Sequence, residues 1–272
     1  MDLRRLENIA NNVRKGILTQ VYSAQSGHPG GSLSAVEILT YLYFEEMNID
    51  ARNPHMPDRD RFIMSKGHAS PVYYSVLANR GYFPTEDLVK FRKLGSYLQG
   101  HPCMQECPGV DMSTGSLGQG FAVAAGMALS AKMSGESYRV YALCGDGELE
   151  EGEIWETAMF AGHKKLNNLT VFIDNNNLQI DGPITEVCNP HPIDAKFRDF
   201  HFQTICVDGH DFLQIRDALE LARNEKERPT AIIASTVKGK GVSFMENQAG
   251  WHGKAPDKDE YEKAMIELEE RL

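Results

Sequence analysis

The sequence lacks the features that mark membrane-spanning, secreted and nucleic-acid-binding proteins. No apolar run approaches the length of a membrane span. The first residues form a charged helical pattern, so we expect neither a signal sequence nor a membrane segment. The formal net charge is −10 and no basic tract is present, which argues against a nucleic-acid partner.

Cysteine is also scarce. The five cysteines are an odd number for a chain of this size, which predicts unpaired thiols in a reducing cytoplasm. Cys103 and Cys107 form a lone C-x₃-C pair without a second pair, so the spacing does not predict a zinc site.

Repeats, low-complexity tracts and internal linkers are absent too, so residues 1–272 are predicted to form a single domain. Helical and strand patterns alternate, which predicts an α/β fold with a doubly wound, mostly parallel sheet flanked by helices. The expected strands are 61–64, 139–144, 169–173, 204–207 and 230–236. The expected helices are 3–22, 33–44, 71–79, 85–93, 120–133, 152–166, 211–224 and 257–272.

Several boundaries rest on individual residues. Ser32 and Thr85 are predicted N-caps of the second and fourth helices. Residues 183–203 contain three prolines and are expected to be irregular. On one face of the helices 3–22 and 152–166 we expect apolar stripes, made of Leu3, Leu6, Ala10, Val13, Ile17 and Val21 and of Ile154, Trp155, Ala158, Met159 and Gly162.

The last helix, about 257–272, carries a capping-box spacing at Asp257 and Glu260. An apolar face follows, which predicts that this helix docks on the domain itself or on a partner; its residues are Tyr261, Met265, Leu268 and Leu272.

The segment 138–182 carries the clearest chemical signal. Its two buried strands are joined by a helix, so they lie parallel in a right-handed crossover. Asp146 follows the first strand and Asn176 follows the second, so both lie at the sheet edge where α/β folds bind ligands. Their oxygens are hard ligands of the kind that Mg²⁺ or Ca²⁺ prefers, and Mg²⁺ completes its shell with phosphate oxygens. The pattern therefore predicts a metal held against a diphosphate.

At these residues the chain resembles the transketolases. The matching motifs are Gly145-Asp146-Gly147, Glu150-Glu151-Gly152, Trp155-Glu156, Ala161-Gly162-His163 and Asp174-Asn175-Asn176. The resemblance implies the diphosphate-binding domain of a thiamine diphosphate fold. It implies that Asp146, the Asn176 side chain and the Leu178 carbonyl hold Mg²⁺, with Ca²⁺ or Mn²⁺ as possible substitutes.

Four of the nine histidines lie beside glycine in turns, where we expect them to be exposed: His28, His68, His101 and His252. In the resemblance they line a sugar channel above the cofactor. Imidazole can donate, accept or transfer a proton near neutral pH. His28 and His252 are the expected proton-transfer residues, while His101 and His68 are expected to donate hydrogen bonds. His163 and His210 are expected to be structural.

The resemblance also assigns cofactor contacts. It places the backbone at Gly115 and Leu117 against the aminopyrimidine, with His68, Gly145, Gly147 and Glu151 also in the cofactor site. Glu151 and Glu156 correspond to residues near the interface of paired subunits. Most acidic residues of 148–156 are otherwise expected to stabilise a helix N-terminus.

The resemblance covers only the family's N-terminal domain. It implies the N-terminal subunit of a split transketolase of pentose phosphate metabolism, which moves a two-carbon ketol unit from a ketose (phosphate) donor to an aldose (phosphate) acceptor. A separately encoded partner would supply the pyrimidine-binding domain, most simply in an α₂β₂ heterotetramer. Two alternatives remain open: a subunit of a related enzyme, of the deoxyxylulose phosphate synthase or 2-oxoacid dehydrogenase kind, and a non-catalytic cofactor- or partner-binding relic.

Overall fold

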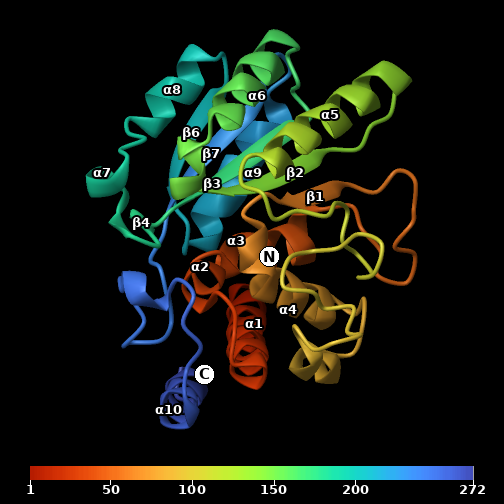
Figure 1. Cartoon of the computed structure of the whole chain (residues 1–272). Helices are drawn as coiled ribbons and strands as arrows, with labels where there is room; N and C mark the ends of the chain where they lie inside the picture. Colours follow the sequence, from red (N-terminus) through yellow and green to blue (C-terminus); the bar gives the residue numbers. More distant parts are fainter. Residues whose placement is uncertain (272) are drawn as a thin grey trace.

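The computed structural model describes residues 1–271, which surround a five-stranded sheet (Figure 1). The strand order is β1-β2-β3-β7-β6, and every neighbouring pair is parallel, as the sequence predicts. The strands are β1 (Arg61–Met64), β2 (Val140–Gly145), β3 (Leu169–Asn175), β6 (Gln203–Asp208) and β7 (Thr230–Ser235).

Helices cover both faces of the sheet, so the predicted doubly wound α/β fold is confirmed (Figure 1). One face is covered by α3 (Val36–Tyr41), α4 (Ser70–Arg80) and α9 (Phe212–Asn224), and α1 (Leu3–Ala24) packs against α3 and α4 in the same core. The other packs against α5 (Gln119–Ser134), α6 (Gly152–His163) and α8 (Ile193–Asp199).

The central strands read as continuous apolar runs because successive side chains point to opposite, equally buried faces. Tyr141 and Leu143 of β2 join the core beneath α1 and α4, while Ala142 and Cys144 join the core beneath α5 and α6. Burial on both faces holds the strands in one register, and their carboxyl ends lie level.

Shorter elements complete the described chain. They are α2 (Pro29–Leu33), the π-helical turn η1 (Leu42–Glu46), the 3₁₀ turns η2 (Gly67–Ala69), η3 (Thr85–Lys90), η4 (Gly147–Glu150) and η5 (Ala249–Trp251), α7 (Ile184–Val187) and the antiparallel pair β4 (Leu178–Gln179) and β5 (Gly182–Pro183).

Both predicted N-caps are wrong. Ser32 lies inside α2, because Pro29 can start a helix at its first position, and the predicted helix 33–44 is divided into α2, α3 and η1. Thr85 is the first residue of a 3₁₀ turn that follows Pro84, and this turn, which ends at Lys90, replaces the expected α-helix. Arg92 then adopts a positive φ of 58°, which is incompatible with continuing a helix.

The prediction of irregular structure for 183–203 is also wrong, because α7 and α8 lie within it. Pro183 and Pro192 directly precede these helices, where proline is tolerated. Two residues leave their predicted stripes, since Leu3 is 38% exposed and Met159 is 56% exposed.

The last helix, α10 (Lys258–Glu269), has the predicted capping box between Asp257 and Glu260. It packs against α1, where Asn11 Nδ2 donates to the Leu268 carbonyl at 2.7 Å. The predicted contribution of Leu272 lies outside the described residues. Among residues 1–271 no helix combines the length and apolar character needed to cross a membrane.

Candidate functional site

The two polar strand tips meet at one edge of the sheet. Gly145 of β2 pairs with Asp174 of β3, so Asp146 and Asn176 follow neighbouring strands at the same level. Both line a pocket of about 140 Å³. Its walls are Gly31, Lys66, His68, Leu117, Gly145, Asp146, Gly147, Glu148, Asn176, Leu178, Gln179, Ile180, Lys238 and His252.

Asp146 is buried at the N-terminus of η4. Its carboxylate accepts from the amide of Gly147 at 2.9 Å and from that of Asn177. Burial and the nearby Asp174 carboxylate raise the pKa of Asp146 to about 7. The donors and positive groups near Asp146 in the described chain therefore do not offset the cost of burying its ionised form. Such a carboxylate is typical of a site that binds a cation.

The neighbouring oxygens fit a metal as well. Asn176 Oδ1 accepts from the Leu178 amide at 3.1 Å and keeps a second lone pair. No cluster of three His, Cys, Asp or Glu with metal-site geometry occurs within residues 1–271. The candidate ligands here are one carboxylate, one side-chain amide oxygen and one backbone carbonyl oxygen. This composition suits Mg²⁺, because Mg²⁺ takes few protein ligands and completes its shell with phosphate oxygens and water. These residues therefore fit a metal bound to a diphosphate.

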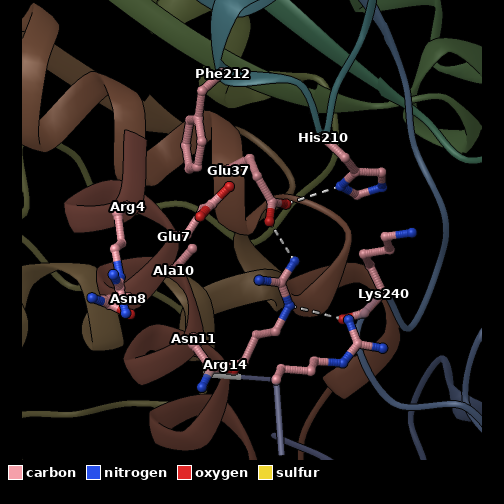
Figure 2. Close-up of a pocket in the computed structure, with 11 residues that line it drawn as sticks. Arg4, Glu7, Asn8, Ala10, Asn11, Arg14, Glu37, His210, Phe212 and Lys240 are labelled. Carbon is pink, nitrogen blue, oxygen red and sulfur yellow. Dashed lines mark hydrogen bonds and ion pairs between the residues drawn. The ribbon is translucent and has the colours of Figure 1, made fainter. Parts of the chain in front are cut away.

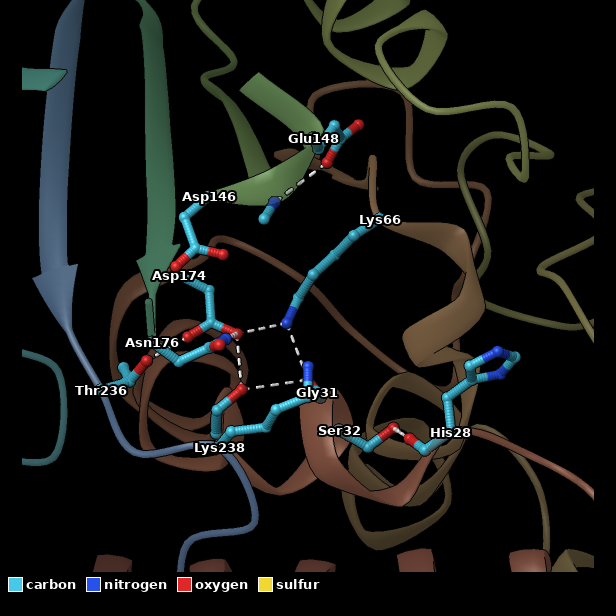
Figure 3. A network of polar contacts seen from close by, with 12 residues as sticks. His28, Gly31, Ser32, Lys66, Asp146, Glu148, Asp174, Asn176, Thr236 and Lys238 are labelled. Atoms are coloured by element: carbon cyan, nitrogen blue, oxygen red, sulfur yellow. Dashed lines mark hydrogen bonds and ion pairs between the residues drawn. The ribbon is translucent and has the colours of Figure 1, made fainter. Parts of the chain in front are cut away.

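A buried ion pair supports the pocket floor (Figure 3). The Lys66 ammonium contacts the fully buried Asp174 carboxylate and donates to the Gly31 carbonyl at 2.7 Å. Asp174 also accepts from the hydroxyls of Ser34 and Thr236. Burial alone would raise the pKa of Asp174, but Lys66 and these donors hold it below its ordinary value. Asp174 is thereby committed to structure, although it lies only two residues from Asn176.

Lys238 brings a second buried cation to the pocket. Its ammonium lies 3.3 Å from the Leu178 carbonyl and 3.2 Å from Nδ1 of His252. Burial, with a smaller contribution from Lys66, lowers the pKa of Lys238 to about 8. A cation that is disfavoured in this way is stabilised by an incoming anion, so Lys238 can bind a phosphate group.

Glu148 belongs to the acidic residues of 148–156, most of which were expected to stabilise a helix N-terminus. It is buried and accepts from Ser65 Oγ at 2.5 Å, Gly118 N at 2.9 Å and Gly145 N at 3.0 Å. It therefore holds the N-terminal end of α5 against the carboxyl end of β2. Burial raises its pKa above the ordinary value.

Three of the four predicted histidines form one cluster. The ring centroids of His28, His68 and His252 lie 5.1 to 5.3 Å apart. They come from the α1–α2 loop, η2 and the η5 turn, so segments remote in sequence converge. They are half-buried rather than exposed as expected. His101 is exposed, and its ring lies beside Gly115, where an added Cβ would be 3.3 Å from it.

Burial is the main cause of the lowered pKa values in this cluster. It lowers the pKa of His28 to about 4, with help from Arg92, and that of His252 to about 3, with help from Lys238. The pKa of His68 is also lowered, by burial and by Lys66. A neutral imidazole offers one ring nitrogen as a hydrogen-bond acceptor, and His28 Nδ1 is buried without a hydrogen-bond partner in the described chain.

Two predicted cofactor residues lie outside the 140 Å³ pocket. Gly115 lines a separate cavity of about 240 Å³ at the start of α5. Glu151 is exposed and packs beside Gly118.

The sequence reasoning missed Lys66, Lys238 and Glu148. Lys66 had a usable signal, since it lies two residues after a predicted strand and two residues before the predicted site residue His68. Lys238 had a similar signal, since it lies three residues after the end of β7. Their burial as charged groups could not be predicted without the three-dimensional arrangement.

Comparison with known proteins identifies what this geometry resembles. Residues 6–269 match the family model described as the transketolase, thiamine diphosphate binding domain. The chain is 43% identical over 264 residues to the 6-deoxy-6-sulfo-D-fructose transketolase subunit SqwG of Clostridium sp. (strain MSTE9), covering 97% of this chain and 96% of that protein. It is 41% identical over 266 residues to an apulose-4-phosphate transketolase subunit of Actinobacillus succinogenes, with the same coverage.

The fold comparison agrees. The solved transketolase of Campylobacter jejuni superposes with a TM-score of 0.93 at 35% identity, covering 99% of this chain but 43% of that one. This chain thus spans under half of that transketolase and nearly all of the two subunits.

Proposed function

This chain belongs to the transketolase family, and we propose that it is the N-terminal, thiamine diphosphate-binding subunit of a split transketolase. The observation that carries the proposal is the convergence of Asp146, Asn176 and three histidines on one sheet edge. The relatives that it covers almost end to end are named as transketolase subunits, which favours this function over the related synthases and dehydrogenases.

Each part of the pocket has a proposed role. Asp146, Asn176 and the Leu178 carbonyl would hold Mg²⁺, and Lys238 would contact the diphosphate. The backbone at Gly115 and Leu117 would lie along the aminopyrimidine, with His68, Gly145, Gly147 and Glu151 nearby. When bound, thiamine diphosphate supplies the electron sink for carbon–carbon cleavage.

The histidines would handle the substrate's hydroxyl groups. His28 and His252 are neutral at pH 7, so each has a ring nitrogen that can accept a hydrogen bond from a sugar hydroxyl, the contact through which a proton would be transferred. His68 and His101 would donate hydrogen bonds that orient the sugar. The close packing of three rings keeps the proton acceptors within one small region.

The substrate is proposed as a class. The named relatives act on a sulfonated fructose and on apulose 4-phosphate, two sugars with an anionic group. We therefore propose a ketose donor with a phosphate or sulfonate group, and place the reaction in the cytoplasm without choosing a pathway.

An exposed apolar surface supports the proposed partner. The helix α5 is apolar around its circumference, which is typical of a helix covered on all sides. On its outer side, a Cβ added at Gly126 would contact nothing, while Met159 and Phe160 of α6 are 56% and 39% exposed. The second chain, docked here, would cover these side chains, and two copies of each chain would give an α₂β₂ heterotetramer.

The proposal is tested by assaying ketol transfer with Mg²⁺ and thiamine diphosphate, first with this chain alone and then with a candidate pyrimidine-binding partner. We expect activity only with both chains and none when Asp146→Ala replaces the parent. Turnover by the isolated chain would disprove the need for a partner. A reconstituted complex that neither binds thiamine diphosphate nor transfers ketol units would disprove the function.

A further inference from the structure

The loop 236–241 carries Lys238 into the pocket and has a second side that faces away from it. On that side Glu37 of α3 contacts both Arg14 of α1 and His210 of the turn before α9. We call these three side chains the brace (Figure 2). The brace borders a surface cavity of about 440 Å³. None of its members was predicted as a site residue, and His210 was expected to be structural.

His210 connects the loop to Glu37. The Val237 amide donates to His210 Nε2 at 2.9 Å, so that nitrogen must be the unprotonated one. The proton is therefore on Nδ1, which lies 2.9 Å from Glu37 Oε2 and donates to it. The two contacts fix one tautomer and one ring orientation.

Arg14 holds the other end of the loop. Its Nη2 donates to Glu37 Oε1 at 2.6 Å, and its Nε donates to the Lys240 carbonyl at 3.0 Å. The approach is close, since a Cβ at Gly241 would lie 2.6 Å from Arg14 Nε. The brace thus binds the backbone at positions 237 and 240, on both sides of Lys238.

Glu37 is the charged centre of the brace. Burial alone would raise its pKa, but Arg14 and His210 lower it to about 2, so the carboxylate is ionised at neutral pH. Its side chain is 9% exposed and that of Arg14 is 8% exposed. Separating the partners of a buried ion pair would leave each charge without compensation, which is costly. The three side chains are therefore held in one arrangement.

We propose that Arg14, Glu37 and His210 are positioning residues that hold the Lys238 loop ready for the cofactor's diphosphate. This rests on the proposed function. The lysine side chain is long and flexible, so its ammonium is placed reliably only if its backbone is fixed. The loop also has backbone anchors outside the brace: Thr236 N donates to the Asn175 carbonyl at 3.1 Å, Gly239 N to the Gly30 carbonyl at 3.0 Å, and Asn247 N to the Lys238 carbonyl at 2.9 Å. Fixing the loop before binding reduces the entropy lost when the anion is bound.

Three variants separate the contacts. His210→Ala removes the link to Val237. His210→Gln places an amide oxygen near the former Nε2 position and should keep that link. In Glu37→Gln an NH₂ group replaces one carboxylate oxygen and faces either Arg14 or His210, both of which are donors. One of the two hydrogen bonds to position 37 should therefore be lost. Asp211→Ala is the matched control, because it removes the N-cap of α9 next to His210 without touching the loop.

The first measurement uses this chain alone. Hydrogen exchange of the 236–241 amides should accelerate in His210→Ala and Glu37→Gln, but not in Asp211→Ala. Nitrogen NMR should report His210 protonated on Nδ1. Unchanged exchange in both brace variants would overturn the proposal, as would the opposite tautomer.

The second measurement titrates thiamine diphosphate with Mg²⁺ into the complex with the partner chain. The affinity should fall about tenfold in His210→Ala, the size expected for one lost hydrogen bond to a charged network, and recover in His210→Gln. The turnover number at saturating cofactor should remain within a few-fold of the parent. Equal losses in His210→Ala and Asp211→Ala would overturn the positioning role. A parent complex that does not bind the cofactor would overturn the proposed function and this inference together, whereas normal binding by both brace variants overturns only the inference.

Discussion

Lys238 joins the two halves of the candidate site, because its ammonium lies 3.3 Å from the Leu178 carbonyl and 3.2 Å from Nδ1 of His252. The first atom is an expected metal ligand and the second belongs to the histidine cluster. One side chain therefore contacts both the region proposed for the diphosphate and the region proposed for the sugar.

Replacing Lys238 by Met should weaken thiamine diphosphate binding about 10- to 100-fold, the loss expected for one charge-assisted contact to a phosphate. Lys240→Met is the control, since this neighbouring lysine points to Glu246 at 4.0 Å, outside the pocket. Calorimetry on the reconstituted complex measures both. Equal affinity in the parent and Lys238→Met would contradict the phosphate contact.

Asp146→Ala should abolish Mg²⁺-dependent binding of the cofactor, a loss of more than about 100-fold, because even outer-shell partners of a metal contribute 10- to 100-fold. Asn176→Ala removes a neutral ligand and should weaken binding less, by about tenfold. The same titration in Mg²⁺ and in EDTA gives the metal-dependent part. Unchanged affinity in Asp146→Ala would exclude it as a ligand.

Lys66→Met should destabilise the chain by about 3–5 kcal/mol, because it leaves the fully buried Asp174 without its counter-charge. The double variant Lys66→Met/Asp174→Asn should cost less than the two single changes together, since no unpaired charge remains. Urea unfolding of the four proteins gives the coupling free energy. The exposed pair Lys165–Glu227 is the control, and its removal should change little.

His28→Gln and His252→Gln should each lower turnover about 10²- to 10⁴-fold, the range for loss of a positioned acid or base. The affinity for thiamine diphosphate should remain near that of the parent, because neither residue is proposed to hold the diphosphate. Steady-state kinetics with a ketose phosphate donor tests this. Turnover within a few-fold of the parent in both variants would make these histidines structural.

The same histidines should make stability depend on pH. The unfolded chain binds protons on them near pH 6.5, whereas burial lowers their folded pKa values to about 4 for His28 and about 3 for His252. Below pH 6.5 the unfolded state therefore binds more protons, and this contribution to stability is lost as pH falls toward 4.

Asp146 acts in the opposite sense, because its pKa is raised in the folded chain. The histidine contribution is therefore measured as the difference in pH-dependent stability between the parent and a variant without these two histidines. A His28→Asn/His252→Asn variant should lose less stability than the parent between pH 6.5 and 4.5. Denaturant unfolding of both proteins at several pH values measures the difference. Parallel stability curves would show that the two rings titrate normally in the folded chain.

The parts of the fold that could be predicted are those encoded in local apolar patterns. The strand 61–64 was predicted with the observed bounds because its apolar run ends where the chain leaves the sheet. Asp146 and Asn176 were placed together because parallel strands end at one edge. The four histidines stood out because each lies beside glycine in a turn, and the resemblance supplied their roles. Their convergence depends on the packing of loops, which no spacing in the chain determines.

The missed features depend on burial rather than on pattern. Their positions just after strands place Lys66 and Lys238 near the sheet edge, but nothing local shows that these lysines are buried. Nothing local distinguishes Glu148 from the acidic residues around it. Proline was misread in 183–203, because it disrupts a helix interior but is compatible with the residue before a helix, the place it takes at α7 and α8.

The bond from Asn11 to the Leu268 carbonyl has a consequence for how the protein is made. These residues lie 257 positions apart, and the Asn11 amide is buried. While the chain is being synthesised from its N-terminus, the face of α1 that carries this amide has no cover until α10 has emerged from the ribosome. We expect the nascent chain to stay open along this seam until α10 has docked, even after the sheet has formed.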